Sequence, residues 1–147
     1  MRYRETGNLH YTFHDSVRFV MDYLSEHYGQ AGLEEVIRAN ALEVHRSIKN
    51  RLDAGDPSEL VAHWIYYLNR EEAPCNIHIA ANTVTIEIPE CPAFRELHKM
   101  GRPVSEHLCL GTRLTNQFWC ENSPFECVHE KLGEAHCRQT FKRRAKA

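Results

Sequence analysis

The side chains able to do chemistry are concentrated between Glu90 and Phe141. These 52 residues hold five of the six cysteines and four of the ten histidines. Thiolates and imidazoles act as nucleophiles, as acids and bases, and as ligands of soft metal ions. We therefore expect any catalytic or metal site in this stretch, and its candidate residues are Glu90, Cys91, His107, Cys109 and Cys137.

Cys91 occupies the most informative position. It follows a predicted strand and directly precedes Pro92, a residue suited to the first turn of a helix. As the N-cap of that helix, the Cys91 sulfur would lie near free backbone N–H groups, which favour a thiolate. The neighbouring Glu90 carboxylate would instead raise the thiol pKa. The alternative is a buried cysteine that ends the strand as a small apolar residue.

His107 and Cys109 are two residues apart near the start of another predicted helix. Positions i and i+2 of a helix do not share a face, so one side chain would point to a pocket and the other to the core. In a partly extended segment both could bind one metal ion. The alternative is one exposed histidine and one core cysteine.

Cys137 lies in the last predicted strand, on the same face as Gln139 and Phe141. A cysteine that shares a strand face with phenylalanine is usually a core residue. The turn at Gly133 could instead bring Cys137 beside Cys91. The other cysteines are interpreted as packing residues, Cys120 and Cys127, or as a loop-edge thiol without an evident partner, Cys75.

Composition disfavours several classes of function. The formal net charge of −2 gives no electrostatic attraction to nucleic acid. No run of about 18 apolar residues could span a membrane, and the first residues lack the apolar core of a signal peptide. We therefore expect a cytoplasmic protein with reduced thiols. No C-x-x-C pair, dinucleotide-binding fingerprint, P-loop, H-E-x-x-H or G-x-S-x-G motif is present.

The elements that must position these residues follow from hydrophobic periodicity. Apolar residues at helical spacing predict helices over residues 17–28, 33–52 and 57–68, with Gly29 ending the first helix and Asp56 capping the third. On the third helix, His63 and Tyr67 form an i, i+4 pair that could line the mouth of a pocket.

Beyond Pro74 the period changes to alternation, which predicts a β-hairpin over residues 77–88. Helices over 92–100 and 105–121 and strands over 125–132 and 135–142 follow. The predicted fold class is α+β, with N-terminal helices packed on an antiparallel sheet built from two hairpins. We expect a single domain over residues 1–147, with a helical part at about 14–72 and a cysteine-rich part at about 75–142.

The cysteine-rich stretch resembles the L-2-amino-thiazoline-4-carboxylic acid hydrolase family. The resemblance covers residues 9–141 and rests on short motifs: Tyr28-Gly29, Glu90-Cys91-Pro92, His107-Leu108-Cys109, and the closing Gly133, Cys137 and Phe141. The same C-terminal arrangement is more distantly similar to the 4-vinyl reductase type of small-molecule-binding domain. The chain departs from the family pattern after Cys137, where Arg138 and Gln139 replace an acidic and an aromatic residue.

The resemblance implies a small hydrolase that acts on a C–N bond of a cyclic amidine or amide. In one mechanism, Cys91 or Cys109 attacks as a thiolate and His107 acts as acid or base. In the other, Cys91, Cys109 and Cys137, with His107 as a further ligand, hold Zn²⁺ or iron, which activates water, and Glu90 orients the ligands. The alternative function is a non-enzymatic sensor module that binds a small molecule or a metal.

The expected partner is a small-molecule substrate, without nucleic acid or membrane. The helix stripes are apolar enough for a homodimer, but packing in the core explains them equally well. A third reading is a structural subunit whose thiols are merely buried.

Overall fold

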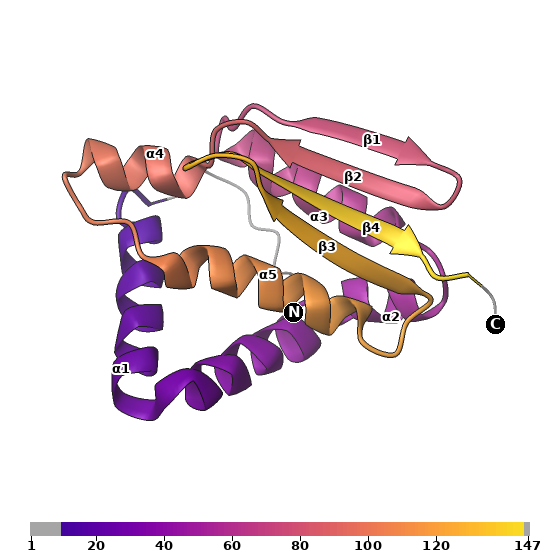
Figure 1. The fold of residues 1–147 in the computed structure, drawn as a ribbon, viewed down its shortest axis with the longest axis horizontal. Coiled ribbons are helices and arrows are strands. Elements are labelled where there is room, and N and C mark those ends of the chain that lie inside the picture. Colours follow the sequence, from indigo (N-terminus) through magenta and orange to yellow (C-terminus); the bar gives the residue numbers. More distant parts are fainter. Residues whose placement is uncertain (1–9, 146–147) are drawn as a thin grey trace.

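The computed structural model of the chain describes residues 10–145. A layer of helices covers one face of a four-stranded antiparallel sheet, which confirms the predicted α+β class (Figure 1). The elements are α1 (Phe13–Ala39), η1 (Asn40–Val44), α2 (Arg46–Asp53), α3 (Ser58–Arg70), β1 (Asn76–Ala80), β2 (Thr83–Ile88), α4 (Pro92–Lys99), α5 (Glu106–Cys120), β3 (Phe125–Lys131) and β4 (Cys137–Arg143).

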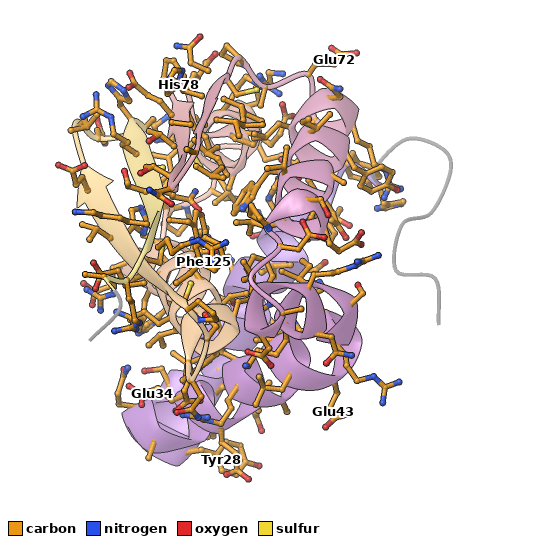
Figure 2. The ribbon with its side chains drawn as sticks, turned by 90° about the vertical axis from the view of Figure 1, so that its right-hand side faces the viewer. Tyr28, Glu34, Glu43, Glu72, His78 and Phe125 are labelled. Carbon is orange, nitrogen blue, oxygen red and sulfur yellow. The ribbon has the colours of Figure 1, made fainter. Side chains whose placement is uncertain are left out.

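The sheet is built from two hairpins, as predicted. Its strand order is β1-β2-β4-β3, so the hairpins join through the antiparallel pairing of β2 with β4. Val84, Ile86 and Ile88 alternate toward the helices and are buried, because successive side chains of a strand point to opposite faces. Figure 2 shows the two layers edge-on, with side chains such as Phe125 filling the space between them.

Helix α1 changes direction sharply at Gly29. The predicted helix end at this glycine corresponds to a kink, after which the chain resumes as a second limb of α1 (Figure 1). Gly29 has φ +70°, a conformation in which a Cβ atom is disfavoured. Because of the kink, the part of α1 after Gly29 points in a different direction from the part before it and leads toward α2.

The predicted helix over residues 33–52 is interrupted by η1, one turn of π-helix. The amide of His45 donates to the carbonyl of Asn40, five residues earlier, at 3.2 Å. The wider turn takes up one additional residue before α2 begins. His45 follows it directly and lines the cavity described below.

The predicted cap of the third helix is displaced by one residue, because the N-cap of α3 is Pro57 and not Asp56. Asp56 accepts a hydrogen bond from the amide of Ser58 at 2.9 Å at the start of α3. Cys91 is the N-cap residue of α4, with Pro92 in the first turn. Ser105 caps α5 and accepts from the amide of His107 at 3.1 Å.

Helix α5 is the central element of the helical layer. It contacts both α1 and the sheet, through β3, as well as η1 and α2. Between α5 and α1 lies a small apolar cluster around Leu33, Ile37 and Leu114. On its other side, Trp119 belongs to the main core, where it is 1% exposed. Among the helices of the described part, none is long and apolar enough to cross a membrane.

Candidate functional site

A cavity of about 950 Å³ lies between the helical layer and the sheet. Its walls come from α1, α3, α4, α5, β3 and β4, so segments distant in sequence meet around it. Four charged lining residues are exposed, namely Glu106, Arg113, Lys131 and Glu134, and Glu71 is partly buried. The buried lining is mainly apolar and aromatic. A volume of this size suits a small organic molecule.

Three of the predicted thiols, Cys91, Cys109 and Cys137, come together at this cavity. The amide of Cys91 donates to the carbonyl of Ala135 at 2.7 Å, and Cys137 pairs with Ile88 at the end of β2. These contacts bring the start of α4 beside the start of β4, as the turn at Gly133 suggested. The first turns of α5 add Cys109, which, after burial, contributes to the raised pKa values of both Cys91 and Cys137.

Cys91 and Cys137 are not activated as nucleophiles. Burial raises the pKa of Cys91, and the nearby amides of Phe94 and Ala93 lower it too little to compensate. Burial likewise raises the pKa of Cys137 to about 11, with Cys91 adding to the effect and Gln139 opposing it. Cys91 is an N-cap residue, as predicted, but the expected thiolate is not favoured at neutral pH, because desolvation outweighs the helix N-terminus.

The predicted metal ligands line one cavity without forming a coordination group. Over residues 10–145, no three side chains of His, Cys, Asp or Glu are placed so that they could hold a metal ion. A zinc or iron ion held by Cys91, His107, Cys109 and Cys137 therefore does not fit the observed geometry.

His107 is instead held by a carboxylate from α1. Its Nδ1 lies 2.8 Å from Oδ1 of Asp22, which also accepts a hydrogen bond from the Ser105 hydroxyl. Arg18 donates to the other oxygen of Asp22 at 3.0 Å. Burial alone would raise the pKa of Asp22, but the hydrogen bonds from Ser105, His107 and Arg18 together lower it. This pairing fixes the imidazole at the cavity wall.

Glu90 lies outside the site. Its side chain is exposed and is not part of the cavity lining, so the predicted role of orienting the cavity groups does not match its position. Asp22 is the carboxylate that orients His107. No pattern in the sequence linked the two, because they are 85 residues apart and lie on different helices.

Aromatic rings line the interior. His63 and Tyr67 both border the cavity with ring centroids 4.6 Å apart, as their i, i+4 spacing suggested. His45 and His63 each meet Trp119 edge-on, with centroids 5.4 and 5.2 Å away. Trp64 also borders the cavity, so both tryptophans of the chain lie on its wall. Burial lowers the pKa of His45, which keeps this imidazole neutral at pH 7.

The remaining cysteines lie outside the cavity. Cys120 is 3% exposed in the main core, and burial raises its pKa to about 12. Cys127 and Cys75 are partly buried and pack against the same core. The interpretation of Cys120 and Cys127 as packing residues is confirmed, and Cys75 also packs on the core.

Comparison with known proteins supports the fold of this chain and says nothing of its function. No protein-family model and no curated protein matches the chain. Among solved structures, the chain is similar to a mutant H-NOX protein from K. algicida in its unliganded Fe(II) form, with a TM-score of 0.51. The alignment covers 95% of this chain and 76% of the H-NOX chain at 16% sequence identity.

Cysteine labelling checks the state of the cavity thiols. At pH 7.5, we expect iodoacetamide to modify Cys91 and Cys137 slowly, because their raised pKa values keep them protonated. Their rates should rise about tenfold for each pH unit up to the pKa. Peptide mapping by mass spectrometry measures each site, with Cys120 as a buried reference. Rapid labelling of Cys91 below pH 8 would contradict this assignment.

The Asp22 carboxylate gives a pH-dependent contribution to stability. Because its pKa is lowered in the folded state, the contribution is present at neutral pH and is lost as pH falls through that lowered value. Asp22→Asn should therefore reduce the free energy of unfolding by about 1 kcal/mol at pH 7, and the difference from wild type should shrink below about pH 4. Urea unfolding at several pH values measures both effects.

Asp53→Asn is the matched control, since Asp53 forms an exposed pair with Lys49 on α2. It should change the free energy of unfolding by less than about 0.5 kcal/mol. A constant difference between wild type and Asp22→Asn down to pH 3 would show that the charge of Asp22 is not responsible.

Proposed function

We propose that this chain is a small-molecule-binding domain whose ligand occupies the cavity between the helices and the sheet. The observation that carries the proposal is the cavity itself, with its volume of about 950 Å³ and its mostly partly buried lining of apolar, aromatic and polar side chains. A void of this size in a chain of 147 residues leaves many side chains without packing partners, which lowers stability. A bound molecule would restore those contacts.

The similarity to an H-NOX protein supports this proposal at the level of fold. The H-NOX structure is an Fe(II) form, so a protein with this arrangement of helices and sheet contains iron. In the present chain, the described side chains offer no ligand group for a bare metal ion. The proposed ligand is therefore an organic molecule that the protein contacts through aromatic and polar side chains.

Filling the cavity with a larger side chain tests the proposal. Thr115 borders the cavity on α5, and Thr115→Phe should weaken binding of planar aromatic probes at least tenfold, because the added ring occupies the same space. Naphthalene, indole and quinoline are suitable probes. Isothermal titration calorimetry measures affinity, and quenching of Trp64 and Trp119 fluorescence locates the probe, because both indoles line the cavity.

Thr85→Phe is the matched control. Thr85 lies on β2 and is not part of the cavity lining, so the same substitution should leave probe binding unchanged. A bound probe at 100 times its Kd should also raise the stability of the wild type by about 2.7 kcal/mol. Failure of every probe to bind the wild-type protein would refute the proposed function.

A hydrolase is the second candidate, and the observation that favours it is the Asp22–His107 pair beside three thiols. Asp22 holds Nδ1 of His107, so the other ring nitrogen is available as a base for a water molecule in the cavity. Burial raises the pKa of Cys91, so little thiolate is present at neutral pH, and a water molecule activated by His107 serves as the nucleophile in this candidate. Such chemistry would open a cyclic amidine, the reaction class that the sequence resemblance implies.

Turnover of L-2-amino-thiazoline-4-carboxylate tests the hydrolase directly. His107→Gln should lower kcat at least about a hundredfold if the imidazole is the base. Cys91→Ala should abolish turnover if the thiol contributes. Cys120→Ala, a change in the core away from the cavity, should affect stability only. If the wild-type protein binds aromatic probes and shows no turnover, the binding function alone remains.

A further inference from the structure

Two buried amide side chains face each other at the cavity wall. Asn116 of α5 is 1% exposed and Gln139 of β4 is 0% exposed. Nδ2 of Asn116 donates a hydrogen bond to Oε1 of Gln139 at 2.6 Å. Both residues line the cavity, where this bond connects α5 to β4, an inner strand of the sheet.

The pair leaves one acceptor and one donor unused. Oδ1 of Asn116 and Nε2 of Gln139 are buried and have no hydrogen-bond partner. Exchanging the oxygen and nitrogen of both amides reverses the bond between them and leaves one acceptor and one donor vacant again. Besides the burial that raises the pKa of Cys137, the nearby Gln139 amide lowers it, but Nε2 of Gln139 has no partner at normal hydrogen-bond geometry, and sulfur is a weak acceptor.

Vacant buried polar atoms are costly to the folded protein. Each one lowers stability by about 1 to 3 kcal/mol, so native proteins contain few of them. Trp119 adds a third, because its Nε1 donor is also buried without a partner. Asn116 and Trp119 are three residues apart on α5 and share one face of the helix. The vacancies therefore cluster on one side of the cavity.

The surroundings of this cluster carry no formal charge. Apart from His63, the lining residues that are at least nine-tenths buried are apolar or neutral. The charged lining residues lie exposed at the rim, except for Glu71, which is partly buried and already paired with His14 at 3.2 Å. His129, opposite Gln139 on β3, is kept neutral at pH 7 because burial lowers its pKa. A charged group placed here would lose its hydration without gaining a counter-charge.

We infer that Asn116 and Gln139 form a subsite for a neutral planar group that carries an N–H donor beside a carbonyl acceptor, as in the edge of a cyclic amide. Oδ1 of Asn116 accepts from the ligand N–H, and Nε2 of Gln139 donates to the ligand carbonyl. The aromatic lining contacts the rest of the ring system. This inference rests on the proposed function, and it defines the class of ligand as a neutral aromatic lactam.

Three probes of similar shape test the hydrogen-bonding requirement. Quinolin-2(1H)-one presents the N–H and the carbonyl, N-methylquinolin-2-one lacks the donor, and naphthalene lacks both groups. We expect the wild-type protein to bind quinolin-2(1H)-one at least tenfold more tightly than the other two, because each analogue leaves a buried polar atom unpaired. Isothermal titration calorimetry measures the three Kd values.

The double variant Asn116→Leu/Gln139→Leu tests the residues. It removes both vacant atoms together with the bond between them, so it should fold with an unchanged or higher Tm. Its affinity for the three probes should agree within about twofold. Gln117→Leu, an exposed position one residue along α5, is the matched control and should keep the wild-type preference. A pair with a purely structural role would instead show a lower Tm and no change in preference.

The outcomes separate this inference from the function on which it rests. Equal binding of all three probes to the wild type would overturn the lactam subsite and leave the ligand-binding cavity in place; a permanently bound water at the amide pair predicts that result. Retention of the preference in the double variant would assign it to other residues and overturn the inference. Failure of all three probes to bind would overturn both.

Discussion

The structure depends on the position of α5 between two partners. One face of this helix packs on α1 through Leu114, and the opposite side carries Trp119 into the main core against the sheet. Because both contacts must be satisfied by one helix, α1 is held away from the sheet where α5 begins. The cavity lies beside this helix, and Trp119 belongs both to the cavity wall and to the main core. In the proposed function, a ligand would therefore contact a residue that also packs α5 against the sheet.

Local features of the fold could be predicted from the sequence because they depend on neighbouring residues. Hydrophobic period distinguished helices from strands, and alternation in β2 identified which face is buried. Gly29 marked a break in α1, and Pro92 placed Cys91 at the start of α4. The grouping of Cys91 with Cys137 was one of two alternatives for the turn at Gly133. It depends on the long-range pairing of β2 with β4, which places Cys137 opposite Ile88.

The site chemistry could not be predicted in the same way, because it depends on desolvation and long-range contacts. The sequence placed Cys91 at a helix start and indicated a thiolate, whereas burial in the folded chain reverses that effect. The sequence suggested Glu90 as the carboxylate that orients the site residues. In the folded chain, Asp22 of α1 is the carboxylate that contacts His107, although it lies 85 residues earlier in the chain. Gln139 did carry a signal, since a glutamine on the core face of a strand needs a partner, but nothing indicated Asn116.

The π-helical turn at residues 40–44 contains one residue more than an α-helical turn over the same path would. A single extra residue separates η1 from an ordinary α-helical path, as the bond from His45 to Asn40 indicates. Successive residues of an α-helix are rotated by about 100°, so loss of one residue here would rotate everything after it by that angle. His45 would leave the cavity wall, and Ile48 and Leu52 would leave the core. The length of this segment is consequently constrained more strongly than its composition, and relatives with the same cavity should conserve the insertion itself.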